Sequence, residues 1–216
     1  MTRPADDPSV DYKVLVRDGY DRCAQRYADS RLEKPPPELA LLTGRLPPRA
    51  AVLDIGCGCG LPVCRELTRH AGVTGIDVSP AMIALARRNV PAGTFTCGDI
   101  MSAEFPDSSF DAVTAFYSVF HLPRQEHEEL FRRTRRWLKP GGYLMTTLNL
   151  RDEDPYTEDD FLGVTMYWSN FGLPRYREML IGLGFSILVD ARLEHGYRDE
   201  LKQAPEVHPL ILAQKA

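Results

Sequence analysis

Apolar positions near the start of the chain recur at helical intervals. The segment "DYKVLVRDGYDRCAQRYADS" (11–30) places most of its apolar residues on one face, which predicts a helix. The proline run in "KPPPE" (34–38) ends this pattern, because proline lacks the backbone donor that a helix interior needs. A second, short helix is expected at 38–46. The polar, proline-bearing residues 1–9 predict a flexible tail.

From about residue 50 onward, short apolar runs alternate with amphipathic segments. The apolar runs are typical of buried strands and lie at 50–56, 73–77, 93–99, 110–120 and 143–149. The segments between them are typical of helices and lie at 61–71, 79–89 and 124–138. Strands that alternate with helices predict a parallel sheet covered by helices on both faces.

The end of the chain departs from this rhythm. A helix is expected at 174–184, followed by strands at 185–193 and 208–216. No helical pattern separates these two strands, so they should pair antiparallel at one side of the sheet. We therefore predict an α/β fold with a three-layer, doubly wound, Rossmann-like sheet, mostly parallel with an antiparallel C-terminal strand.

Composition narrows the class of protein. The chain has 216 residues, 44% hydrophobic and 26% charged, which suffices for a core without disulfides or metals. Its net charge of −4 argues against a dedicated nucleic-acid binder, which usually carries a basic stripe. No apolar run is long enough to cross a membrane, and the N-terminus has no apolar signal core. With five cysteines that fit free thiols, a cytoplasmic protein is expected.

The most informative local motif is "DIGCGCG" (54–60). Its three glycines follow the first core strand and precede a helix, where a nucleotide-type loop is expected. Leu61 stands where a dinucleotide-binding loop would carry its last glycine, which weakens a nicotinamide reading. The two cysteines of the motif, with Cys64, could instead hold zinc. No second cluster of His or Cys has a familiar spacing, so we expect no metal.

Two acidic residues follow the next two strands. Asp77 lies roughly 20 residues after the first glycine of the loop, where a carboxylate can hold the two hydroxyls of a ribose. Asp99 ends the third strand and could accept a hydrogen bond from an adenine amino group. Either residue alone could be a helix cap or a turn residue. Their occurrence at successive strand ends favours a nucleoside site.

Taken together, the motifs identify a family. The stretches "VLDIGCGCG", "GIDVSPAMIALARRN", "FTCGDI", "FDAVTAFYSVFHL" and "LKPGGYLMTT" resemble, in order and spacing, the successive motifs of class I S-adenosylmethionine-dependent methyltransferases. The upstream "YDRCAQRY" is similar to the N-terminal helix that covers the cofactor in that family. The resemblance spans roughly 18–148. It implies S-adenosylmethionine as cofactor and S-adenosylhomocysteine as product, and the acidic composition favours a small-molecule acceptor.

The resemblance also implies an organisation of the chain and a set of cofactor contacts. The tail at 1–9 would precede one domain at 10–216, made of lid helices (10–45), a cofactor-binding core (50–148), a substrate or lid insertion (149–174) and a C-terminal helix and hairpin (175–216). In this reading Asp54 would support the cofactor's ammonium, Asp77 its ribose and Asp99 its adenine. The full set of implied contacts is Tyr27, Asp54, Gly56, Gly58, Asp77, Val78, Met82, Asp99, Ile100, Phe116 and Tyr117.

The acceptor side is less clear in the sequence. His121 is the candidate general base and Tyr20 could orient the acceptor, although both could instead be structural. Tyr167, Trp168 and His208 are the candidate substrate-binding residues. The insertion mixes aromatic residues with six carboxylates, so it could favour a cationic acceptor. Alternatively, the acids could be solvated and only the aromatic residues would line the pocket.

Alternative functions stay open from the sequence. A methyltransferase that acts on RNA or protein is one, although the chain lacks the "(D/N)PP(Y/F)" signature of several such enzymes. An NAD(P)-dependent oxidoreductase and a non-catalytic protein that binds S-adenosylmethionine are the others. The sequence does not indicate whether the acceptor atom is O, N or S, and it does not indicate the oligomeric state.

Overall fold

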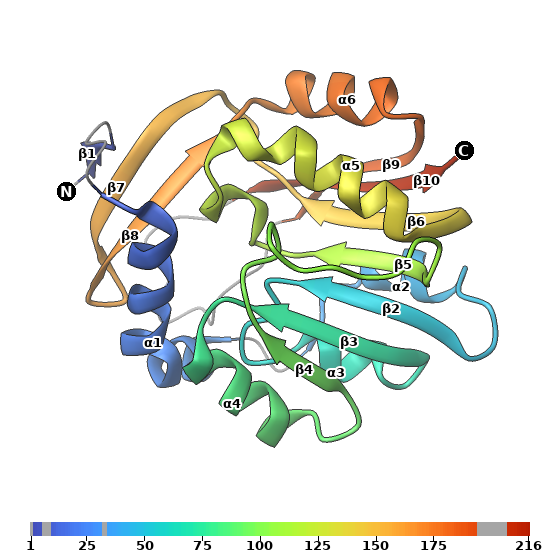
Figure 1. Cartoon of the computed structure of the whole chain (residues 1–216), viewed down its shortest axis with the longest axis horizontal. Coiled ribbons are helices and arrows are strands. Elements are labelled where there is room, and N and C mark those ends of the chain that lie inside the picture. Colours follow the sequence, from blue (N-terminus) through green and yellow to red (C-terminus); the bar gives the residue numbers. More distant parts are fainter. Residues whose placement is uncertain (1, 6–9, 32–33, 194–206) are drawn as a thin grey trace.

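In the described part of the chain, seven strands form the central sheet (Figure 1), in the order β4-β3-β2-β5-β6-β10-β9. The computed structural model describes residues 2–5, 10–31, 34–193 and 207–216. Strands β2 to β6 are parallel, whereas β10 runs antiparallel to both β6 and β9. The strands are β2 (Ala50–Ile55), β3 (Ala71–Asp77), β4 (Thr94–Cys97), β5 (Phe110–Ala115), β6 (Leu138–Thr147), β9 (Phe185–Leu193) and β10 (His208–Lys215). The predicted fold class is confirmed.

Helices cover both faces of this sheet and bury a separate core on each. The first core includes side chains of α2 (Leu39–Thr43), α3 (Val63–Leu67) and α4 (Pro80–Asn89). The second includes side chains of α5 (His127–Trp137) and α6 (Leu173–Gly182). Because successive strand residues point to opposite faces, Val52 joins the first core and its neighbour Leu53 the second. This explains the continuous apolar runs of the strands.

A separate layer, which we call the cap, lies beyond the carboxyl ends of the parallel strands (Figure 1). It consists of α1 (Tyr12–Ser30) and a small antiparallel sheet in the order β1-β7-β8. The strands of the small sheet are β1 (Thr2–Pro4), β7 (Glu153–Phe161) and β8 (Val164–Asn170). The Asp11 carboxylate caps the first turn of α1, accepting from the backbone N–H of Lys13 and Val14. The helix packs on β8 through a small apolar cluster.

The cap differs from the sequence prediction in two places. Within the tail predicted at 1–9, Thr2–Pro4 form β1 and pair with β7, while residues 1 and 6–9 lie outside the described residues. The insertion, for which no strands were predicted, forms the β7–β8 hairpin. Leu162 and Gly163 at its tip have φ of 51° and 76°, as a two-residue turn with two left-handed positions requires. A leucine in that conformation is uncommon, so this turn could not be predicted from its residue types.

The connection between β9 and β10, predicted to contain no helix, falls on residues 194–206, which lie outside the described residues. Within the described ranges, no helix combines the length and the apolar character needed to cross a membrane.

Candidate functional site

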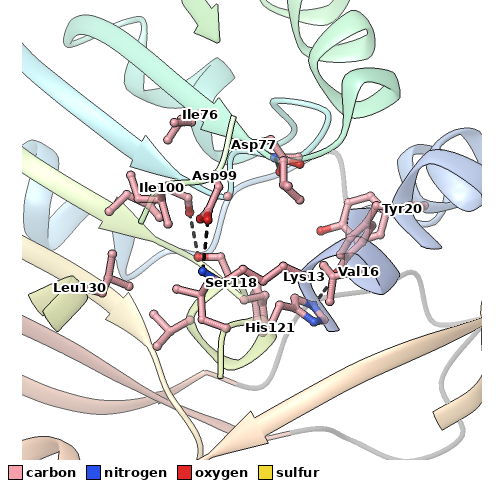
Figure 2. Close-up of a pocket in the computed structure, with 18 residues that line it drawn as sticks. Lys13, Val16, Tyr20, Ile76, Asp77, Asp99, Ile100, Ser118, His121 and Leu130 are labelled. Carbon is pink, nitrogen blue, oxygen red and sulfur yellow. Dashed lines mark hydrogen bonds and ion pairs between the residues drawn. The ribbon is translucent and has the colours of Figure 1, made fainter. Parts of the chain in front are cut away.

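A cavity opens between the cap and the carboxyl ends of the parallel strands (Figure 2). It encloses about 770 Å³ of space, which includes solvent at its open side. Its position matches the general rule that ligands of open α/β sheets bind at the carboxyl ends of the strands. The predicted site residues that line it are Tyr20, Tyr27, Gly56, Gly58, Asp77, Val78, Asp99, Ile100, Tyr117 and His121.

The glycine loop after β2 meets two different requirements. Gly56 has φ of 66°, and a Cβ placed on it would lie 2.3 Å from the Cβ of Ser118, so a side chain cannot fit. Gly58 has φ of 51°, and its Cβ would only contact the Tyr27 ring, at 3.5 Å. Gly56 is therefore needed for packing between the ends of β2 and β5. Gly58 leaves a narrow backbone surface in the cavity wall, as a bound nucleoside cofactor would require.

Asp77 is fixed to this loop at the end of β3. Its Oδ2 accepts from the backbone N–H of Gly58 and its Oδ1 from that of Ser79, both at 2.9 Å. Burial raises the pKa of Asp77 to about 6, although these two hydrogen bonds oppose the shift. The carboxylate is thus held in one orientation in the cavity wall, where two further hydroxyl donors could share its oxygens.

His121 and Tyr20 meet in the cavity although 101 residues separate them. His121 Nε2 lies 2.7 Å from the Tyr20 hydroxyl, and His121 Nδ1 lies 2.9 Å from the backbone carbonyl of Tyr167. A carbonyl can only accept, so Nδ1 carries the proton and Nε2 accepts from Tyr20. Burial lowers the pKa of His121 to about 4, with the carbonyl contact opposing the shift. The imidazole is therefore neutral at neutral pH, with its lone pair facing Tyr20.

Three residues predicted to touch the cofactor lie outside the cavity wall. Asp54 is buried beneath the loop, where Thr114 Oγ1 donates to it at 2.6 Å and Cys64 Sγ at 3.0 Å. Burial raises the pKa of Asp54 to about 6. Met82 packs in a small cluster that includes Tyr20 and Tyr27 of α1. Phe116 belongs to the first core. These side chains support the wall and do not form it.

The predicted substrate-binding residues form a layer behind the cavity wall. The Trp168 ring lies 4.5 Å from that of His121, and the His208 ring lies 5.2 Å from that of Tyr117. The Tyr167 ring stacks on Tyr12, and only its carbonyl reaches His121. The structure thus places all three next to lining residues and none of them in the wall itself.

Carboxylates of the insertion face away from this cavity. Asp152 and Asp154 both pair with Arg124, each at 2.9 Å. Glu153 accepts from the side chain of Asn149 at 2.8 Å. In the described ranges, no carboxylate of the insertion lines the cavity. This supports the interpretation in which the acids lie outside the pocket, and it weakens the case for a cationic acceptor.

Sequence reasoning missed several lining residues. The additional ones are Lys13, Val16, Ile55, Ile76, Ser118, Val119, Leu122 and Leu130. Val16 could have been found, because it lies one helical turn before Tyr20 and so shares its face. Lys13 could not, because a lysine in the first turn of a helix is normally solvated.

The cysteines of the loop are buried thiols. Burial raises the pKa of Cys57, Cys59 and Cys64, so none is a thiolate at neutral pH. Among the residues that the structure describes, no group of three or more His, Cys, Asp or Glu side chains is arranged to hold a metal ion.

The fold and the cavity define an α/β domain that binds a nucleoside-type ligand over its glycine loop. Residues 52–142 match the family model described as a methyltransferase domain. This match agrees with the resemblance of the chain's motifs to those of class I, S-adenosylmethionine-dependent methyltransferases.

Known relatives are similar over part of their length. The chain is 38% identical to 27-O-demethylrifamycin SV methyltransferase of Amycolatopsis mediterranei over 112 residues, which cover 48% of this chain and 40% of that enzyme. It is 30% identical to demethylmenaquinone methyltransferase of Symbiobacterium thermophilum over 168 residues, which cover 72% of this chain and 63% of that enzyme. The chain thus spans less than two thirds of these relatives.

A solved structure shares the fold over nearly the whole chain. The 1,6-didemethyltoxoflavin-N1-methyltransferase of Burkholderia thailandensis, with 1,6-didemethyltoxoflavin and S-adenosylhomocysteine bound, superposes with a TM-score of 0.73 at 20% identity. The superposition covers 100% of this chain and 95% of that one. At this identity the likeness concerns the fold alone.

Proposed function

We propose that this protein binds S-adenosylmethionine and transfers its methyl group to an oxygen, nitrogen or sulfur atom of a small-molecule acceptor, releasing S-adenosylhomocysteine. The observation that carries the proposal is the convergence in one cavity of the glycine loop, the Asp77 carboxylate and the Tyr20–His121 pair. The relatives described above are named for small-molecule substrates, which supports that class of acceptor.

The residues of the core would hold the cofactor. The loop at Gly56 and Gly58 would present its backbone to the methionine part. Asp77 would accept from the ribose hydroxyls, and Asp99 from the adenine amino group, with Ile100 against the ring. When bound, the cofactor supplies an electrophilic sulfonium methyl, so the protein's main task is to orient the acceptor toward it.

The Tyr20–His121 pair would remove the acceptor's proton. Tyr20 donates to His121 Nε2, so its oxygen can take a proton from an acceptor O–H, N–H or S–H while its own proton passes to Nε2. The carbonyl of Tyr167 holds the imidazole in the tautomer that this transfer needs and stabilises the imidazolium that results. The low pKa of His121 favours return of that proton once the product leaves.

The first test is cofactor binding, measured by titration calorimetry with S-adenosylmethionine. Asp77→Ala should weaken binding by about 1–3 kcal/mol, because charge-assisted hydrogen bonds to the ribose are lost. Asp107→Ala, an exposed aspartate that pairs only with Arg136 in the described ranges, is the matched control and should bind like the wild type. Equal affinity of the Asp77 variant and the wild type would refute the site.

The second test separates the competing functions. A library of small molecules is incubated with the protein and S-adenosylmethionine, and methylated products are detected by mass spectrometry. Binding of S-adenosylmethionine without any methylated product would favour a non-catalytic protein. Tighter binding of NAD(P) than of S-adenosylmethionine would favour an oxidoreductase. Methylation of RNA or protein alone would favour a macromolecular acceptor.

A further inference from the structure

Lys13 ties the first turn of α1 to two carboxylates of the core. Its Nζ lies 3.1 Å from Asp99 Oδ2 and 2.6 Å from Glu126 Oε2. Asp99 follows β4, and Glu126 ends the short 3₁₀ helix η2 (Arg124–Glu126) that precedes α5. Figure 2 shows the Lys13 side chain extending toward Asp99. Burial alone would lower the pKa of Lys13, but its contacts with Glu126 and Asp99 raise it, so the ammonium is charged.

Other polar contacts attach α1 to the core farther along the helix. Tyr20 bonds to His121, and Asp21 Oδ1 accepts from Ser79 Oγ at 2.5 Å and from the backbone N–H of Ala81 at 3.0 Å. Asp21 does not line the cavity, so a ligand leaves its contacts with the start of α4 intact. Lys13 lies about 12 Å along the helix from Asp21, at 1.5 Å per residue. At the Asp21 end, α1 is therefore attached to the core by contacts outside the cavity, whereas at the Lys13 end its contact with Asp99 lies in the cavity wall.

When the cofactor binds, its adenine amino group would compete with Lys13 for the Asp99 carboxylate. Asp99 Oδ1 accepts from the backbone N–H of Met101 at 2.9 Å, so an adenine amino group would share an Asp99 oxygen either with Met101 or with Lys13. Oδ2 is the partner of Lys13. Because Glu126 is the nearer of the two carboxylates, Lys13 can release Asp99 and keep an ion pair. Glu126 takes no part in the proposed adenine contacts.

We propose that Lys13 retains the cofactor: it gives up Asp99 to the adenine, stays paired with Glu126, and holds α1 closed over the occupied cavity. This inference rests on the proposed function. Lys13 then acts through α1 and is a positioning residue. Its loss should speed escape of the cofactor and leave entry nearly unchanged, because entry takes place while α1 is open.

The test measures dissociation of S-adenosylhomocysteine by stopped-flow displacement. Lys13→Gln and Glu126→Gln should each raise the dissociation rate roughly fivefold, the effect of one partly exposed ion pair. The double variant should be no faster than either single variant, because both remove the same contact. Lys13→Arg should restore slow release. The difference in dissociation rate between the wild type and Lys13→Gln should shrink at about 1 M salt, where the Debye length is ~3 Å.

Arg17→Gln is the matched control. Arg17 lies one turn from Lys13 on the same helix and pairs with exposed Asp18, so its substitution should leave the dissociation rate unchanged. A Lys13→Gln rate equal to that of Arg17→Gln would overturn the inference, and so would slower release from Lys13→Gln, which would make Lys13 a competitor of the cofactor.

A second readout needs no cofactor. Hydrogen exchange of the first-turn amides of α1 should be faster in Lys13→Gln than in Arg17→Gln, because the ion pairs hold that turn to the core. If the wild-type protein fails to bind S-adenosylmethionine, the proposed function and the retention role both fall. If it binds normally and neither readout changes, only the role of Lys13 is overturned.

Discussion

Burial of His121 makes the folded protein sensitive to acid in a calculable way. The side chain is 7% exposed, and burial lowers the pKa of His121 to about 4 from the 6.5 of the free group. Between these two values the unfolded chain binds a proton that the folded chain does not. The contribution of His121 to stability is therefore complete above pH 6.5 and is lost as pH falls toward 4.

The size of this loss follows from the two pKa values. At pH 5 it amounts to roughly 2 kcal/mol relative to pH 8, from the linkage relation for one group. For a chain of this length that corresponds to about 4–8 °C in Tm. His121→Asn removes the titrating ring, and the asparagine amide can still donate toward the Tyr167 carbonyl. The variant should lose less Tm than the wild type between pH 8 and pH 5, by about 4–8 °C.

Other buried groups also change protonation between pH 8 and pH 5, so the Tm of the variant must be compared with that of the wild type at each pH. Burial also lowers the pKa of His127 to about 4, and it raises that of Asp54 and of Asp77 to about 6. The two carboxyl groups act in the opposite sense, because stabilisation of their protonated forms grows as pH falls from 6 toward 3.8. The wild-type curve alone is therefore a sum of opposing contributions. Subtracting the Tm-against-pH curve of His121→Asn from that of the wild type isolates the contribution of His121.

The assay is thermal unfolding followed by circular dichroism at pH 8, 6.5 and 5, without ligand. His70→Asn is the control, because the His70 side chain is 40% exposed and pairs with Glu66 at the surface. It should lose as much Tm on acidification as the wild type. If His121→Asn loses as much as the wild type too, the imidazole is not held neutral by burial, and the reasoning about its tautomer fails with it.

Further predictions concern the loop and the paired side chains. Gly56→Ala should destabilise the fold, because its Cβ would lie 2.3 Å from that of Ser118; thermal unfolding would show a lowered Tm. Gly58→Ala should cost only about 1 kcal/mol in stability from its left-handed backbone, yet weaken cofactor binding in calorimetry. His121→Ala and Tyr20→Phe should each lower turnover by about 10²-fold or more while sparing cofactor affinity. Wild-type turnover in either variant would remove that residue from proton transfer.

The parts of the fold that could be predicted from sequence are those set by local periodicity. Buried parallel strands give continuous apolar runs, and these marked β2, β3 and β5 within a few residues. The cap could not be predicted in this way. Its β1 strand and hairpin are stabilised by pairing with each other and by packing on α1, which are contacts between distant parts of the chain.

The candidate site divides along the same line. Its proposed cofactor side is built at strand ends, so Asp77 and Asp99 could be predicted from their positions after successive strands, and both line the cavity. Lys13 contributes through a tertiary ion pair and has no local signature. Trp168 was chosen for its residue type, and its place behind His121 depends on the register of the hairpin.

This division bears on how the acceptor is selected. Most of the proposed cofactor contacts lie in the walls formed by the core, so the cap is the side of the cavity left for the acceptor. The cap supplies Tyr20 directly and contacts His121 through the carbonyl of Tyr167, so the pair to which we assign proton transfer depends on the position of the cap. A change of acceptor therefore requires changes in α1 and the hairpin that keep these two contacts. Substitutions in β8 that move the Tyr167 carbonyl should alter turnover before they alter cofactor affinity.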